Sequence, residues 1–187
     1  MSTQGLDDPL STPAQGMQPS MAIAPSAERA AVPHIELTAV DSLDAIIRTL
    51  YASLYPAAHR YDAPGDGAPP GAPGWARFRA LFDPSARLVK VADGTTSAMT
   101  VDEFIAKVEA SPGRAVAERE LARRTDAYAG IAQVFSSYDR VGPQGEVCRG
   151  INTIQLRNDG RRWWITSLMW ADEQADEPMP SRYLRRH

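Results

Sequence analysis

The sequence has few of the residues that disulfides and metal centres require. It contains one cysteine, Cys148, and three histidines, His34, His59 and His187. A single cysteine cannot form an intramolecular disulfide, and it leaves no cluster of thiolates for zinc. None of the histidines falls in a segment that the hydrophobic pattern predicts as a strand. We therefore expect no metal site and no cofactor.

The sequence also lacks an excess of basic residues and any long apolar run. Its formal net charge is -3 and its pI is about 5.6, whereas nucleic-acid-binding proteins usually gather a basic excess on one face. No apolar run reaches the roughly 18 residues of a membrane span, and the N-terminus has no cationic segment followed by an apolar one. We expect a cytoplasmic protein that binds neither nucleic acid nor membrane.

The distribution of proline divides the chain. Residues 1–37 form a Pro/Ala-rich leader without a sustained apolar period, and such a segment buries too little surface to offset its ordering entropy, so we expect it to be largely disordered. An arm that covers a neighbouring subunit is the alternative. Residues 38–175 are predicted to form one domain, interrupted by a Pro/Gly-rich loop at 61–74, and residues 176–187 a C-terminal tail.

Three segments show helical features. The first, 41–55, has apolar residues at i, i+3, i+4, i+7, i+8 and i+11, which make one face of an amphipathic helix. The second begins at Trp75 and ends before Pro84. The third begins at Thr100, whose spacing from Glu103 is that of a capping box.

The remaining elements are predicted as strands. One short strand, 87–91, lies between the second and third helices, and the chain after residue 115 alternates strands and turns. The predicted strands there are 116–125, 131–141, 147–157 and a last strand to Trp170, with a tight turn at 158–160. Helices first and a strand meander afterwards predict an α+β fold, with an antiparallel sheet covered on one face by helices.

Four segments carry a resemblance to a known superfamily. They are GWARFRALFDPSARLV (74–89), MTVDEFI (99–105), IAQVFSSYD (131–139) and RGINTIQLRNDGRRWWITSLMW (149–170). Together they resemble the nuclear transport factor 2-like superfamily, the cone-shaped fold of ketosteroid isomerase, scytalone dehydratase and SnoaL-like cyclases, and most of all its bacterial lumazine-binding-like branch. The resemblance implies a cystatin-like cone, a curved sheet wrapped around the N-terminal helices, with a pocket at its open end. It also implies a homodimer that pairs through the outer face of the sheet.

Enzymes of this superfamily place a carboxylate or histidine in the pocket, often with a tyrosine or a second acid that polarises a carbonyl. In ketosteroid isomerases the strand after the phenylalanine-rich helix ends in the aspartate base, but in this sequence Lys90 or its neighbours occupy that place. The histidines also lie outside the predicted strands. The resemblance therefore supports neither the isomerase mechanism nor the histidine-dependent dehydratase mechanism.

Two glutamates remain as candidate acids or bases. With period-two alternation, Glu118 and Glu120 share one face of a strand, and Arg119, Leu121 and Arg123 share the other. If the glutamates face the cone, they can transfer protons. If they face outward, they pair with arginines, and the position of Leu121 on the arginine face favours this solvated arrangement.

The same alternation places Trp164 and Trp170 on one face of the last strand and Trp163 on the other. One set is expected to line the cone and the other to enter a dimer interface, unless both belong to the core. Asn152 could bind a ligand carbonyl or satisfy a buried backbone group.

We predict a protein that binds a small hydrophobic or aromatic molecule in an apolar pocket. The predicted lining is Tyr51, Trp75, Phe78, Asn152, Trp164 and Trp170. Two alternatives remain open: a dehydratase, cyclase or isomerase that uses Glu118 or Glu120 as base, and a non-catalytic dimerisation module.

Overall fold

The computed structural model describes residues 35–54, 74–111 and 117–184. All of them belong to one compact unit, Val32–His187. Residues 1–34 of the predicted leader, nearly all of the Pro/Gly-rich loop and the three histidines lie outside the described residues. Within the described ranges, no helix is both long enough and apolar enough to cross a membrane.

The three predicted helices are confirmed. They are α1 (Leu43–Leu54), α2 (Trp75–Leu81) and α3 (Val101–Glu109), and a short 3-10 turn, η1 (Leu37–Ala39), precedes α1. The apolar side of α1 is buried, with Ile46 and Ile47 fully enclosed. At the start of α3 the backbone N–H of Glu103 donates to the Thr100 hydroxyl, and the Thr100 N–H donates to the Glu103 carboxylate at 2.7 Å. This capping box is the one that the sequence spacing predicts.

Six strands form one mixed sheet in the order β2-β1-β6-β5-β4-β3. They are β1 (Phe82–Ala92), β2 (Thr95–Met99), β3 (Ala117–Tyr128), β4 (Ile131–Val141), β5 (Val147–Asn158) and β6 (Trp163–Asp172). The antiparallel meander β3–β6 is confirmed. β1 and β6 run parallel, so the expectation of a wholly antiparallel sheet is wrong at this pair. No hairpin joins these two strands, and no local turn therefore fixes their relative direction.

β2 was not predicted from the sequence. It returns along β1 after a turn in which Asp93 and Gly94 both have positive φ, 49° and 70°. This left-handed pair is typical of a tight hairpin connection. β2 is a short edge strand of small and polar residues that has only one buried position, Met99, so its hydrophobic pattern is weak.

Two irregularities in register change which side chains face the helices. On β3, Glu120 pairs with Tyr138 and Ala122 with Ser137, which leaves Leu121 as an additional residue. On β6, Ser167 pairs with Gln155 and Ile165 with Leu156, which leaves Thr166 as an additional residue. Each β-bulge reverses the alternation of the residues beyond it.

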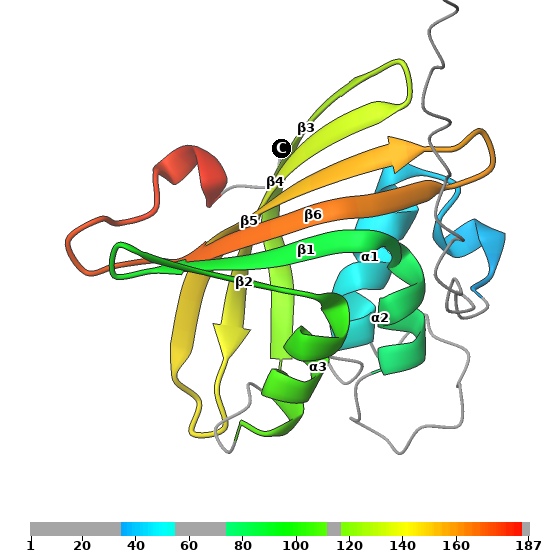
Figure 1. Cartoon of the computed structure of the whole chain (residues 1–187). Helices are drawn as coiled ribbons and strands as arrows, with labels where there is room; N and C mark the ends of the chain where they lie inside the picture. The colour runs from blue at the N-terminus through cyan, green and yellow to red at the C-terminus, as the bar shows by residue number, and fades with distance from the viewer. Residues whose placement is uncertain (1–34, 55–73, 112–116, 185–187) are drawn as a thin grey trace, which may run out of the picture. The chain divides into compact units, whose positions relative to one another are not determined.

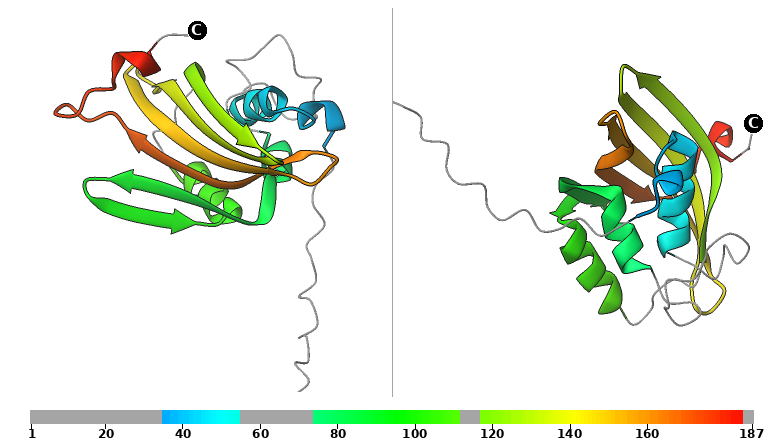
Figure 2. Two further views of the ribbon diagram at one scale, coloured as in Figure 1. Left: turned by 90° about the horizontal axis from the view of Figure 1, so that it is seen from above. Right: turned by 90° about the vertical axis from the view of Figure 1, so that its right-hand side faces the viewer.

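The sheet curves around the helices (Figure 1; Figure 2). We call the face that carries Val134, Ile154 and Leu168 the inner face, because these side chains are buried in the core with α1 and α2. The outer face carries Phe135 and Met169, which are 37% and 40% exposed.

The C-terminal segment lies against the outer face. Its turn η3 (Ser181–Tyr183) is drawn in red and lies on the opposite side of the sheet from the helices (Figure 2, right). The ring of Tyr183 stacks on Phe135 with centroids 6.2 Å apart, and the Ser137 hydroxyl donates to the carbonyl oxygen of Tyr183. Within the predicted tail, Tyr183 therefore packs on the outer face, and Met179 is buried.

Candidate functional site

A cavity of about 430 Å³ lies between the inner face of the sheet and helices α1 and α3. Its walls are mostly apolar and consist of Leu50, Leu54, Phe78, Leu88, Met99, Phe104, Val108, Leu168 and Trp170. The polar side chains Tyr51, Glu118, Tyr138, Arg140 and Asn152 also line it. Lys90, Lys107 and Glu146 are more exposed lining residues. An apolar cavity with a few convergent polar groups is the usual composition of a small-molecule site.

Glu118 is the least satisfied of these polar groups. β3 places it opposite Arg140 on β4, and only 6% of the residue is exposed. Among the described residues, its carboxyl forms no hydrogen bond and no ion pair. Burial raises the pKa of Glu118 from 4.5 to about 7, although the positive charge of Arg140 acts in the opposite direction. Glu118 can therefore gain or lose a proton near neutral pH.

Arg140 is neutralised by Asp172 instead. Its guanidinium donates to Asp172 Oδ1 at 3.0 Å, and Tyr138 donates to the same oxygen at 2.7 Å. Lys90 lies 3.6 Å from the other oxygen. Burial alone would raise the pKa of Asp172, but the hydrogen bond from Tyr138 and the nearby positive charges hold it below its ordinary value.

Gly150 allows Tyr138 to reach Asp172. Tyr138 on β4 pairs with Gly150 on β5, and Gly150 pairs with Asp172 on β6. A Cβ at position 150 would overlap the Tyr138 hydroxyl and the carbonyl oxygen of Ala171. The tyrosine therefore crosses the sheet over a strand position that has no side chain.

A chain of hydrogen bonds leads from the cavity into the sheet. The Asn152 amide donates to the Tyr51 hydroxyl at 3.1 Å, and Tyr51 lies 2.8 Å from the Ser136 hydroxyl. Ser136 donates to Glu120 at 2.6 Å, and Arg123 holds Glu120 through two hydrogen bonds of 2.8 and 2.7 Å. Burial, followed by the charge of Glu118, raises the pKa of Tyr51, so this phenol stays protonated.

Five of the predicted site residues line the cavity: Tyr51, Phe78, Asn152, Trp170 and Glu118. The expectation that the strand glutamates are solvated is wrong for Glu118, because it faces the enclosed inner side of the sheet. Glu120 shares that face but contacts Ser136 and Arg123 without lining the cavity. Arg123 was expected on the opposite face, and the bulge at Leu121 brings it to the side of Glu120.

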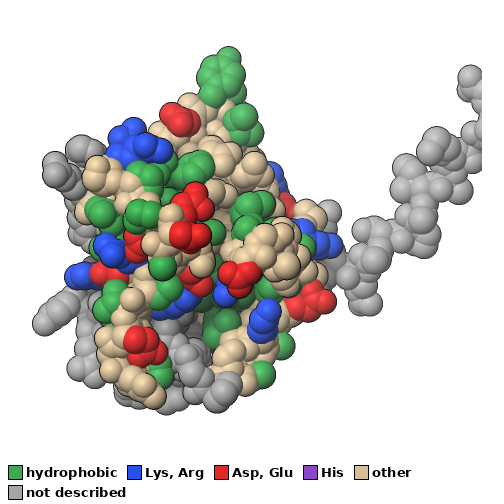
Figure 3. Space-filling view, turned by 90° about the vertical axis from the view of Figure 1, so that its left-hand side faces the viewer, with side chains coloured by type: hydrophobic (Ala, Val, Ile, Leu, Met, Phe, Trp, Pro, Cys, Tyr) green, Lys and Arg blue, Asp and Glu red, His purple; other side chains and the backbone are tan. Residues whose placement is uncertain are grey.

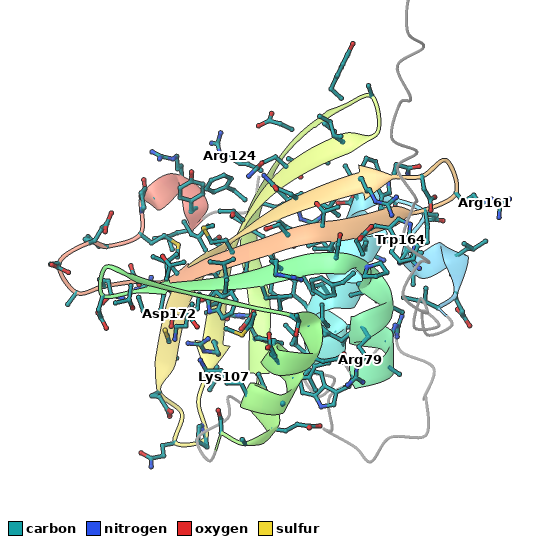
Figure 4. All side chains as sticks on the ribbon, in the orientation of Figure 1. Arg79, Lys107, Arg124, Arg161, Trp164 and Asp172 are labelled. Carbon is teal, nitrogen blue, oxygen red and sulfur yellow. The ribbon has the colours of Figure 1, made fainter. Side chains whose placement is uncertain are left out.

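Trp75 and Trp164 do not line the cavity. Trp75 packs edge-on against Phe78, with ring centroids 5.8 Å apart, and so supports the wall from behind. Trp164 lies at the far end of β6 from Asp172 (Figure 4). Its ring lies 3.7 Å from the guanidinium of Arg162, and its indole N–H donates to Asp159 at 2.7 Å. The bulge at Thr166 separates it from the face that carries Trp170.

Phe104, Arg140 and Lys107 are among the cavity residues that sequence reasoning did not select. A signal existed for Arg140, because it is in phase with Val134, Ser136 and Tyr138 on β4. A signal also existed for Phe104, because it recurs with Val101 and Val108 at helical spacing on α3; it faces the cavity because α3 packs against β1 and α2. Lys107 belongs to the same helix, and Figure 4 shows it on the side of the molecule where Asp172 lies.

The charged groups near the cavity do not form a metal site. Within the described residues, no group of three or more His, Cys, Asp or Glu side chains could hold a metal ion. The free thiol of Cys148 lines the cavity, and burial raises its pKa, so it is a weak nucleophile. Figure 3 shows acidic, basic and hydrophobic side chains interspersed on the side of the molecule that it displays.

Solved structures share this architecture. An NTF2-like protein of unknown function from Pseudomonas putida matches with a TM-score of 0.52 and 10% identity, over 74% of this chain and 89% of that one. The chain has the nuclear transport factor 2-like fold. A candidate Ca/calmodulin-dependent kinase II association domain from Exiguobacterium sibiricum matches with a TM-score of 0.52 and 8% identity, over 71% and 91%. A protein with a cystatin-like fold from Caulobacter vibrioides matches with a TM-score of 0.49 and 14% identity, over 73% and 90%.

No protein-family model and no curated protein matches the chain. The identities to the solved structures show the NTF2-like fold alone, since one fold hosts many unrelated functions. The side chains of the cavity therefore provide the evidence for its function.

Proposed function

We propose that the cavity binds a small, largely apolar molecule. Its volume of about 430 Å³ lies within the range of about 300–1,000 Å³ that is typical of small-molecule sites. The aromatic part of the wall is continuous: Phe78 stacks on Phe104 with centroids 5.5 Å apart, and Phe104 meets Trp170 edge-on at 5.8 Å. These rings offer planar contact to an aromatic ligand.

The observation that carries this proposal is the buried Glu118 carboxyl, which lines the cavity without a hydrogen bond from the described residues. A buried polar group without a hydrogen bond costs free energy, and such groups concentrate at functional sites. A fold selected only for stability would gain from an apolar side chain at this position. A ligand that pairs with Glu118 supplies the partner that the described residues do not.

Calorimetric titration with naphthalene derivatives tests the proposal. Leu168 lines the cavity and its neighbour Met169 points outward, so Leu168→Phe and Met169→Phe form a matched pair. We expect Leu168→Phe to weaken binding at least about tenfold because the added ring volume fills the cavity, while Met169→Phe binds as the wild type does. Equal binding by both variants, or none by the wild type, would contradict the proposal.

Proton transfer at a bound ligand is the second candidate function. It is favoured by the pKa of Glu118, about 7, because a general base is most effective near the operating pH. The test is deuterium exchange at the carbon next to the carbonyl of 2-tetralone, followed by NMR. If the wild type exchanges the deuterium faster than buffer alone does, and Glu118→Gln does not, the result would support catalysis. If the wild type exchanges it only at the rate of buffer alone, the result would contradict catalysis and support binding alone.

The resemblance also predicts a homodimer, and the sequence, which has no apolar run of membrane-spanning length and no secretory signal, predicts a location in the cytoplasm; both stay predictions. The homodimer is supported by the exposed apolar side chains of the outer face, Phe135 and Met169.

A further inference from the structure

The hydroxyl protons of the two buried tyrosines are already used within the protein. Ser136 gives its single proton to Glu120, so its oxygen must accept the proton of Tyr51 at 2.8 Å. Tyr51 in turn accepts from the Asn152 amide. Tyr138 gives its proton to Asp172 at 2.7 Å. Neither tyrosine can donate to a ligand unless one of these bonds breaks.

The other polar groups deep in the cavity are mainly acceptors. When ionised, at a pH above its pKa of about 7, the Glu118 carboxylate accepts up to four hydrogen bonds and donates none, and it forms none with the described residues. The Oδ1 atom of Asn152 likewise accepts no hydrogen bond from them, because only the amide nitrogen of Asn152 is engaged. Three cationic donors also line the cavity. Arg140 donates through Nη2 to Asp172 and Cys148, Lys90 lies 3.6 Å from Asp172, and Lys107 is an exposed residue of α3.

We propose that the cavity selects molecules that present a hydrogen-bond donor, a hydroxyl or an amine, to Glu118 and Asn152 while an apolar body lies against the aromatic wall. This inference rests on the proposed binding function and specifies its ligand class. A ligand whose polar end is a ketone or an ether leaves both protein acceptors without a partner. A buried acceptor that is left without a donor reduces the affinity more than the loss or gain of one methylene group on the ligand does.

The electrostatic balance supports the same choice. Arg140 and Lys90 form ion pairs with Asp172. The charge of Arg140 also lowers the pKa of Glu118, but the Glu118 carboxylate forms no ion pair with the described residues. A donor, and above all a protonated amine, stabilises the ionised carboxylate. A carbonyl oxygen would place a second partial negative charge beside it.

The experiment compares the wild-type protein's affinity for three naphthalene probes by calorimetry at pH 8, where Glu118 is ionised. 2-Naphthol carries a hydroxyl donor, 2-(aminomethyl)naphthalene carries an ammonium donor, and 2-methoxynaphthalene has only an acceptor. We expect at least one donor probe to bind tenfold or more tightly than 2-methoxynaphthalene. The tighter of the two donor probes then identifies a hydroxyl or an amine as the preferred group.

Variants locate the preference within the cavity. Glu118→Gln keeps an acceptor and adds a donor, so the preference for donor probes should shrink to about threefold or less. Asp126→Asn changes an exposed carboxylate on the outer face and should leave the preference unchanged. Loss of the preference in both variants would overturn the role of Glu118.

Two further outcomes separate this inference from the proposed function. Equal affinity of the wild type for all three probes would overturn the inference, while the cavity would still be a binding site. Failure of the wild type to bind any of them, with unsubstituted naphthalene included, would overturn the proposed function as well.

Discussion

Glu118 gains its properties from residues that lie far from it in the sequence. Arg140 on the neighbouring strand and Asp172 on β6 set the charges around it, while the curved sheet and α1 remove it from water. The same residue in a shorter or flatter sheet would be an ordinary exposed glutamate. Because burial raises the pKa of Glu118, this residue makes the free energy of unfolding decrease as pH rises, whereas most carboxylates do the opposite.

Glu118→Gln is expected to change the pH dependence of unfolding. The unfolded chain loses the Glu118 proton near pH 4.5, and the folded protein keeps it until about pH 7. The folded state therefore holds more protons in this window, and the wild-type free energy of unfolding falls as pH rises through it. Each unit by which the folded and unfolded pKa values differ corresponds to about 1.4 kcal/mol, so the free energy of unfolding falls by on the order of 3 kcal/mol across this window.

Urea denaturation at intervals from pH 4 to 8 measures this effect. As pH rises, the free energy of unfolding of Glu118→Gln should increase relative to that of the wild type. For Asp126→Asn, the free energy of unfolding should change with pH as it does in the wild type. Parallel curves for Glu118→Gln and the wild type would contradict the burial of an unpaired carboxyl.

Gly150→Ala is expected to destabilise the fold. The added methyl group overlaps Tyr138 and the backbone of Ala171, and overpacking of this kind typically costs about 1–3 kcal/mol. Val147→Ala, at a 63% exposed position on the same strand, is the matched control and should change stability by less than about 0.5 kcal/mol. If Gly150→Ala and the wild type unfold at the same temperature, Tyr138 does not pack closely enough on β5 to exclude a methyl group at position 150.

Among the secondary-structure elements, α3 is the one whose start is most clearly determined locally. Its capping box satisfies the Thr100 and Glu103 backbone N–H groups reciprocally, and the helix then presents Ile105 to the core and Phe104 and Val108 to the cavity. The cap therefore positions one wall of the candidate site. A frayed first turn would move Phe104 away from Trp170.

Thr100→Ala is expected to lower the free energy of unfolding by about 1 kcal/mol, because it removes the side-chain oxygen that accepts from Glu103. Thr100→Ser keeps that oxygen and should retain most of the stability. Chemical denaturation compares the three proteins. If the serine and alanine variants are equally destabilised, the hydroxyl is not the group that matters.

The described part of the molecule has two faces with different roles. The inner face encloses the core and the cavity, and the outer face carries the C-terminal segment beside exposed apolar side chains such as Phe135 and Met169. Exposed apolar area on a sheet surface is typical of a surface that associates. We propose that a second copy of the chain covers it.

Sedimentation velocity at micromolar concentration should therefore show a dimer. Met169→Lys places a charge in the proposed interface and should shift the protein toward monomer. Leu37→Lys alters a 62% exposed residue on η1, which lies on the helix side of the sheet (Figure 2, right), and should leave the dimer intact. A monomeric wild type would contradict the pairing.

Local features of the sequence determined the three helices, the capping box and the antiparallel meander. Each depends on residues within one turn, one face or one hairpin, so spacing alone predicts it. Apolar spacing also identified Tyr51 and Phe78, which line the cavity, and the β5 alternation identified Asn152. These residues are in phase with buried neighbours on a single element.

Only the tertiary structure decided where Glu118, Arg123 and Trp164 point. An additional residue at Leu121 reverses Arg123 relative to Glu120, and one at Thr166 places Trp164 and Trp170 on opposite faces. Strand pairing, which joins residues distant in the sequence, decides where each additional residue is accommodated and which face Glu118 occupies. The parallel direction of β1 and β6 has the same origin. Burial and hydrogen-bond direction then left Glu118 without a hydrogen-bond partner among the described residues, because both depend on side chains contributed by four strands and a helix.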